Sequence, residues 1–146
     1  MKTSTICVHG AENNTSTTGA VTVPIYQAAT FAHPGLGESH GYDYSRTQNP
    51  TRKYLEKTVA NLEKGAGALA FSTGMAAVAA LVELFGNGDN IIASDDLYGG
   101  TIRLFDNTAV KRGIYIDYVN TSSPAEIEKA VKPSTKAVFI ETPLIL

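Results

Sequence analysis

Apolar residues after position 50 follow a helical period first and then alternate between short runs and longer periodic stretches. Leu55, Val59 and Leu62 recur at helical spacing and predict a helix over residues 51–64, with Gly65 at its C′ position. The later pattern predicts strands at residues 66–71, 90–94, 113–119 and 136–140, and helices at residues 74–85, 100–111 and from 124 onward. This alternation indicates βαβ units on a mostly parallel sheet.

The first fifty residues lack this periodicity and are rich in Thr, Gly, Asn and Pro. They contain short extended pieces, such as residues 21–26. So long a stretch with little regular structure is unusual inside a small domain. We therefore expect residues 1–50 to form an arm that packs on another subunit, and residues 51–146 to form an incomplete large domain.

Composition narrows the class of protein. The chain has 146 residues, of which 43% are hydrophobic and 18% charged, with a net charge of −2. These values are typical of a globular protein, and the lack of a basic run disfavours a nucleic-acid binder. The single cysteine, Cys7, excludes an internal disulfide framework and has no metal-ligand spacing with His9. From this lack of ligand spacing we expect no metal site. No apolar run approaches membrane length, so we expect a cytoplasmic protein.

Two segments carry the features of a phosphate site. Tyr44-Ser45-Arg46 offers a phenol and a guanidinium two residues apart, and a planar guanidinium matches phosphate oxygens. Downstream, Thr73-Gly74-Met75 runs straight into an alanine-rich helical stretch. The unpaired N–H groups and the positive dipole end of such a helix attract anions. The two segments together predict a phosphorylated cofactor.

Polar residues also follow the predicted strands. Residues 72–75, residues 94–98 and Glu141 all stand at strand carboxyl ends. Ligands of open α/β sheets bind at this edge, so these residues are expected to converge on one site. A strand-end carboxylate such as Glu141 is also compatible with simple solvation, and both interpretations stay open here.

Four motifs in order make the chain similar to a known family. They are Tyr44-Ser45-Arg46 with Asn49-Pro50-Thr51, Ser72-Thr73-Gly74-Met75, Asp95-Asp96-Leu97-Tyr98-Gly99-Gly100-Thr101, and Phe139-Ile140-Glu141-Thr142-Pro143. This order and spacing resembles the Cys/Met-metabolism (transsulfuration) enzymes that use pyridoxal 5′-phosphate (PLP). Residues 33–44 are most similar to the bacterial cystathionine γ-synthase and O-acetylhomoserine sulfhydrylase group. The resemblance implies part of the type I PLP-enzyme fold, which is aspartate-aminotransferase-like, and a dimer or homotetramer formed through the N-terminal arm.

The same resemblance implies roles for individual residues. Gly74 and Met75 would hold the cofactor phosphate through backbone N–H groups, and Tyr98 would stack on the cofactor ring. Tyr44 and Arg46 would reach the phosphate of the neighbouring subunit's cofactor, and Tyr44 would also help to activate the substrate. An ordinary exposed pair is the alternative for Tyr44 and Arg46.

The resemblance further implies that Glu141 lines the substrate pocket. Gly100 stands where methionine γ-lyases usually carry Cys, which disfavours that activity.

Three features of the family are missing from these 146 residues. Leu144-Ile145-Leu146 stands where the family has Ser-Asn-Pro, whose Asn contacts the cofactor. The Asp that pairs with the ring nitrogen and the Schiff-base lysine are also missing. Lys136 does not replace that lysine, because it precedes a strand and so lies at the wrong edge of the sheet. We therefore expect the 146 residues alone to be inactive, and Leu146 not to be the natural end of the protein.

The resulting hypothesis is that the chain is the N-terminal part of a PLP-dependent enzyme. That enzyme would catalyse γ-replacement on an O-acyl-homoserine and form cystathionine or homocysteine. A cystathionine lyase of the same family is the first alternative. The second is a non-catalytic interaction protein that pairs with a full-length paralogue.

Overall fold

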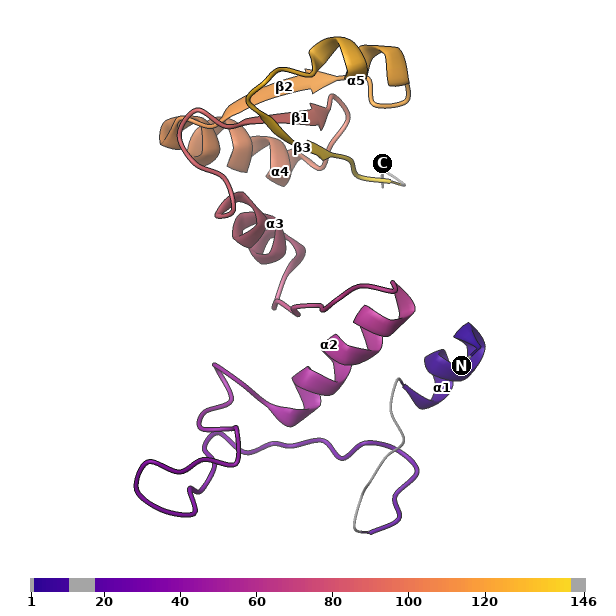
Figure 1. Ribbon diagram of the computed structural model, residues 1–146, viewed down its shortest axis with the longest axis vertical. Coiled ribbons are helices and arrows are strands. Elements are labelled where there is room, and N and C mark those ends of the chain that lie inside the picture. Colours follow the sequence, from indigo (N-terminus) through magenta and orange to yellow (C-terminus); the bar gives the residue numbers. More distant parts are fainter. Residues whose placement is uncertain (1, 11–17, 143–146) are drawn as a thin grey trace. The chain divides into compact units, whose positions relative to one another are not determined.

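The computed structural model describes residues 2–10 and 18–142 (Figure 1), so the segment Leu144–Leu146 lies outside the described residues. The chain divides into two compact units, Met1–Ala70 and Phe71–Leu146. The first contains α1 (Thr3–His9) and α2 (Pro50–Leu62). The second contains α3 (Gly74–Val82), β1 (Asn90–Ser94), α4 (Gly99–Leu104), a π-helical turn (Phe105–Ala109), a 3-10 turn (Val110–Arg112), β2 (Tyr115–Val119), α5 (Pro124–Ala130) and β3 (Thr135–Phe139).

The second unit is built on a parallel sheet with the strand order β2-β1-β3. The chain crosses from β1 to its neighbour β2, and then returns past β1 to β3. Parallel crossovers are almost always right-handed, so these two opposite steps put the connecting helices on opposite faces. Figure 1 shows α4 and α5 on opposite sides of the sheet. The predicted α/β fold with a parallel sheet is confirmed.

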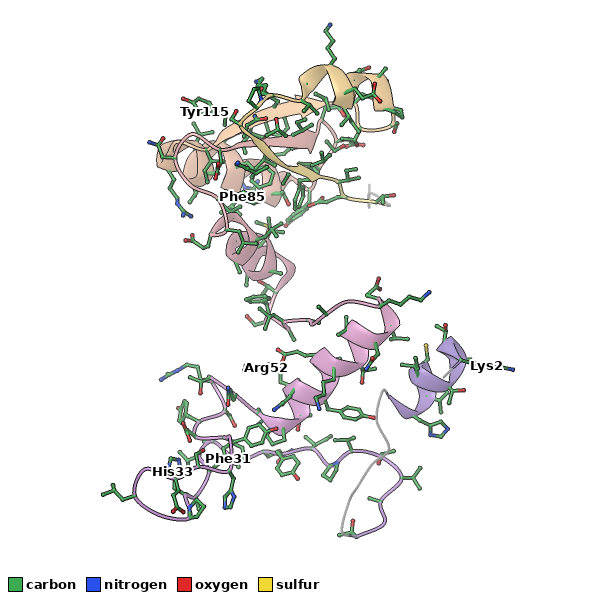
Figure 2. The ribbon with its side chains drawn as sticks, in the orientation of Figure 1. Lys2, Phe31, His33, Arg52, Phe85 and Tyr115 are labelled. Atoms are coloured by element: carbon green, nitrogen blue, oxygen red, sulfur yellow. The ribbon has the colours of Figure 1, made fainter. Side chains whose placement is uncertain are left out.

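The core of the second unit forms around β1, whose five residues are all buried. Ile91 and Ala93, two apart, pack with the buried Phe105. Phe105 meets Phe139 edge-to-face with a centroid separation of 5.3 Å. Phe85, which follows α3 and is labelled in Figure 2, packs against the same cluster. This core fixes the loops that leave the carboxyl ends of β1 and β3.

A buried polar network joins the amino ends of the three strands. The fully buried Asn90 amide donates to Asp117 Oδ2 (2.8 Å) and to the Tyr115 carbonyl (3.3 Å). Its oxygen accepts from the Thr135 hydroxyl at 2.7 Å. Lys132 Nζ lies 2.5 Å from Asp117 Oδ2, and its hydrogen bond holds the pKa of that carboxyl below its usual value. Asn90 is therefore satisfied on both its donor and acceptor sides.

Among the described residues of the first unit, hydrogen bonds rather than buried apolar side chains hold the segments together. Asn49 is the N-cap of α2, where its oxygen accepts from Thr51 N–H at 2.9 Å. The Asn49 amide also donates to the Tyr26 carbonyl (3.2 Å) and Ser45 Oγ (2.9 Å). Tyr54 on α2 donates to the His9 carbonyl at the end of α1, at 2.7 Å. Asn49 thus ties the segments around Tyr26 and Ser45 to the start of α2, and Tyr54 ties α1 to α2.

Three details differ from the sequence predictions. Lys64, with φ of +55°, takes the C′ position that was assigned to Gly65, and Gly65 N–H instead closes the turn on the Ala60 carbonyl at 2.8 Å. Residues 66–71 form no strand, because no described strand pairs with them, and Ala70 N–H instead bonds to Glu56 Oε1. The helix α1 was not predicted at all.

Candidate functional site

The start of α3 presents two unpaired amides. Thr73 is its N-cap: its hydroxyl accepts from Ala76 N–H at 3.0 Å, and its carbonyl accepts from Ala77 N–H at 3.2 Å. The N–H groups of Gly74 and Met75 are left without an acceptor in the described part of the chain. A Cβ added to Gly74 would meet nothing within 4 Å. The two amides named from the sequence are thus the two that the cap leaves open to an anion.

A cavity of about 360 Å³ lies against these amides. Ligand sites commonly enclose roughly 300–1,000 Å³, so this one can hold a small cofactor. It is formed by the start of α3, the loop after β1, α4 and the residue beyond β3. Its lining residues are Thr73, Gly74, Met75, Val78, Tyr98, Thr101 and Glu141. The structure therefore brings together the four predicted residues of this unit: Gly74, Met75, Tyr98 and Glu141.

Tyr98 presents an aromatic ring to this cavity from the N-cap position of α4. Its side chain is 60% exposed, so a ring face is free to stack on a planar ligand. The ring lies close over the backbone at Gly100, where a Cβ would fall 2.4 Å from Tyr98 Cε1 and 3.1 Å from Met75 Sδ. Gly100 therefore leaves the space in which the Tyr98 ring lies.

Glu141 uses both carboxylate oxygens within the protein. Oε2 accepts from the Tyr98 backbone N–H at 2.8 Å, and Oε1 accepts from the Thr101 hydroxyl at 2.8 Å. Simple solvation of Glu141 does not describe this arrangement. Its predicted role in the substrate pocket stays a prediction.

Thr73 lies in the segment 72–75 that the sequence placed at the site, whereas Val78 and Thr101 were not predicted as parts of the cavity wall. Thr101 carried a usable signal, because it is a hydroxyl in the first turn of a helix that packs on the core. Its side chain is 1% exposed, and a buried hydroxyl requires a partner. That partner, Glu141, is 40 residues further along the chain, so local spacing gave no indication of it.

Tyr44 and Arg46 lie together in the first unit. Tyr44 pairs with Thr30 in an isolated antiparallel bridge. The Arg46 guanidinium carbon lies 4.9 Å from the centroid of the Tyr44 ring, a cation–π distance. No carboxylate pairs with Arg46 within the described residues, so its charge is available to an anion. Their predicted contact with the cofactor phosphate of a neighbouring subunit stays a prediction.

No group of three or more His, Cys, Asp or Glu side chains in the described residues is arranged to hold a metal ion. None of the helices in residues 2–10 and 18–142 is both long and apolar enough to cross a membrane.

Comparison with known proteins decides the family. Residues 4–144 match the family model described as Cys/Met metabolism PLP-dependent enzyme. The chain belongs to this family. Its members depend on PLP, so the cofactor predicted from the sequence is that of the family.

The relatives include lyases and synthases. The chain is 49% identical over 143 residues to a cystathionine gamma-lyase of Bacillus subtilis, covering 98% of this chain and 38% of that protein. It is 51% identical over 126 residues to a cystathionine gamma-synthase/O-acetylhomoserine (thiol)-lyase of the same organism, covering 86% and 34%. The structure of cystathionine gamma-lyase from Lactobacillus plantarum complexed with L-serine matches with a TM-score of 0.88 and 44% identity, covering 98% and 37%. The chain thus spans somewhat over a third of the length of these relatives.

The residues around the cavity fit this cofactor. Gly74 and Met75 offer two open amides for the phosphate at the positive end of a nine-residue helix. Tyr98 offers an exposed ring for a planar heterocycle. The cavity volume suits a molecule of this class.

Proposed function

We propose that this chain is the phosphate-holding and ring-stacking part of a PLP-dependent enzyme of γ-replacement on an O-acyl-homoserine, which forms cystathionine or homocysteine. The main support is the cavity at the start of α3, where the Thr73 cap leaves the Gly74 and Met75 amides open beside the exposed Tyr98 ring. Residues 33–44, with their similarity to the γ-synthase and sulfhydrylase group, favour replacement chemistry.

Each residue has a definite task in this proposal. Gly74 and Met75 donate their N–H groups to the phosphate, and Tyr98 orients the cofactor by covering one face of its ring. The cofactor, when bound, supplies an electron sink for negative charge on a substrate carbon. Tyr44 holds and moves a proton at its phenol oxygen, and Arg46 beside it keeps a positive charge near that phenol.

A cystathionine lyase is the second candidate. The observation that favours it is the 49% identity to the Bacillus subtilis gamma-lyase over almost the whole chain. The two candidates differ in the substrate that they consume. The protein purified from its native source should therefore be assayed with O-acetylhomoserine plus cysteine or sulfide, and separately with cystathionine alone. Faster turnover of cystathionine alone would replace the synthase proposal with the lyase.

Self-association through residues 1–50 is also part of the proposal. Val21, Ile25 and Leu36 in this segment are more than three quarters exposed within the chain. A subunit interface would remove such apolar surface from water. Light scattering of the chain and of a Val21→Ser, Ile25→Ser double variant tests this, and an unchanged oligomer would contradict it.

The cofactor proposal is tested with a ligand that forms no covalent bond. Pyridoxine 5′-phosphate lacks the aldehyde of PLP, so surface lysines do not trap it. Titration into the ¹⁵N-labelled chain should shift the amide resonances of Gly74, Met75 and Tyr98. Pyridoxine, which lacks the phosphate, is the control and should shift them much less. Equal shifts with both ligands, or none with either, would count against the proposal.

We expect the 146 residues alone to give no turnover, because none of them takes the place of the Schiff-base lysine. The intact mass of the product from the native source should be measured beside the activity assay. Turnover of O-acetylhomoserine by the purified 146 residues would overturn this expectation.

A further inference from the structure

The carboxylate of Glu141, which also lines the cavity, holds the Tyr98 loop through a direct hydrogen bond. Tyr98 is the N-cap of α4, yet it provides no side-chain cap. Glu141, just beyond β3, accepts from the Tyr98 backbone N–H at 2.8 Å and from the Thr101 hydroxyl at 2.8 Å. A residue distant in sequence therefore caps the first turn of α4, and its negative charge lies at the positive end of this helix.

The geometry leaves little freedom at this point. Thr101 is 1% exposed, so its hydroxyl has no access to water as an alternative partner. Its oxygen also lies 4.0 Å from Met75 Sδ, on the first turn of α3. Gly100 completes the arrangement, because a Cβ there would overlap the Tyr98 ring. The backbone of the ring-bearing loop is thus held by Glu141, and the ring itself lies in the space left by Gly100.

From this arrangement we infer that Glu141 is a positioning residue that fixes the Tyr98 ring for stacking, and is not a group that handles substrate protons. Both of its oxygens are occupied by donors of the protein. This inference rests on the proposed function, because it concerns the ring that is to stack on the cofactor. It adds a positioning role to the substrate-pocket prediction for Glu141, which stays untested.

The hydrogen bond itself is tested without cofactor. Glu141→Ala should speed hydrogen exchange of the Tyr98 amide by about 10- to 100-fold, as expected for loss of a charge-assisted hydrogen bond. Glu141→Gln keeps one accepting oxygen and should give a smaller increase. Glu128→Ala, which removes an exposed carboxylate on α5, is the matched control and should leave this amide unchanged. Exchange at Ile92 in β1 reports whether the whole unit has been destabilised.

The consequence for the ring is tested with two ligands. Glu141→Ala should weaken pyridoxine 5′-phosphate about 3- to 10-fold, the size of a lost stacking contact, and should leave inorganic phosphate unchanged. Gly100→Ala displaces the ring but keeps both Glu141 bonds. Like Glu141→Ala, it should therefore weaken pyridoxine 5′-phosphate relative to inorganic phosphate. A purely structural role would weaken both ligands together.

Three results overturn the inference: unchanged exchange at Tyr98 in Glu141→Ala, equally faster exchange at Ile92, or equal weakening of both ligands. If Glu141→Ala does not fold, Glu141→Gln and Thr101→Val decide: Gln keeps an oxygen for the Tyr98 N–H but loses the negative charge, and Val removes the hydroxyl that donates to Glu141 Oε1. Failure of the unmodified chain to bind pyridoxine 5′-phosphate would overturn the proposed function instead. In that case the exchange comparison still decides whether Glu141 holds the Tyr98 loop.

Discussion

The two units of this chain are stabilised by different interactions. Every buried apolar side chain among the described residues lies in the second unit, where Phe105, Ile91 and Ile92 are almost completely enclosed. In the first unit, Leu55 and Val59 on α2 are 53% and 40% exposed, and Asn49 and Tyr54 hold the segments together through hydrogen bonds. Hydrophobic burial contributes most to stability, so the second unit should be the more stable of the two.

The largest expected effect comes from the core of the second unit. Phe105→Ala removes a fully buried ring that meets Phe139 edge-to-face, and should lower the free energy of unfolding of this unit by about 3–5 kcal/mol. Leu55→Ala, at a half-exposed position on α2, should change the free energy of unfolding of the first unit by less than about 0.5 kcal/mol. Urea unfolding followed by resonances of each unit measures both. Similar losses in the two variants would contradict the comparison.

The polar network at the amino ends of the strands should give the next largest effect. Asn90→Ala leaves the Thr135 hydroxyl and a lone pair of Asp117 without their buried partner, and should cost about 1–3 kcal/mol. Asn107→Ala removes an exposed amide whose side-chain bond within the described residues goes to the Arg103 carbonyl, and serves as control. The same urea titration compares them, and a cost below that of Asn107→Ala would show that Asn90 is not required.

A smaller effect is expected in the first unit. Tyr54→Phe removes the hydrogen bond to the His9 carbonyl and should cost about 1 kcal/mol locally. The measurement is hydrogen exchange of the α1 amides, which should quicken while those of β1 stay unchanged. Tyr115→Phe removes an exposed hydroxyl from the second unit and is the control. If α1 keeps its protection, the first unit has another source of stability than the one described here.

The smallest effect concerns pH. The Lys132 hydrogen bond lowers the pKa of Asp117 from its ordinary value of 3.8, so the unfolded chain binds this proton more tightly than the folded chain. The pair therefore stabilises the fold above pH 4, and that contribution is lost as the pH falls through the lowered pKa. Because Lys132 is half exposed, the contribution is at most about 1 kcal/mol.

Replacing the carboxylate tests this pH dependence. Asp117→Asn should flatten the dependence of the urea midpoint between pH 5 and about pH 3, whereas Asp96→Asn at an exposed position should not. An equally steep dependence in Asp117→Asn would contradict the assignment.

The same contrast explains what the sequence could predict. The strand at 90–94 was predicted at its observed bounds, because the short apolar run Ile91-Ile92-Ala93 after the turn at 86–89 is a local signal that does not depend on the rest of the chain. Gly74 and Met75 were named because the start of the alanine-rich helix is a local signal and because the motif resembles the family; the Thr73 cap that leaves their amides open came from the structure. The Glu141–Thr101 bond spans 40 residues, and the missing strand at 66–71 depends on a pairing partner. Interactions between residues far apart in the sequence leave no periodic pattern, so neither of these two features could be predicted from the sequence.

The strand order has a consequence for synthesis on the ribosome. The central strand β1 is made first, yet its second edge is covered only by β3, since Asn90 and Thr135 are 45 residues apart. At roughly 5–20 residues per second, translation of that interval takes on the order of 2–9 s. During this time the apolar segment Ile91-Ile92-Ala93 has an unpaired edge on which another nascent chain could add a strand. Slow codons between β2 and β3 should therefore lower the soluble yield of this protein, while slow codons after β3 should not.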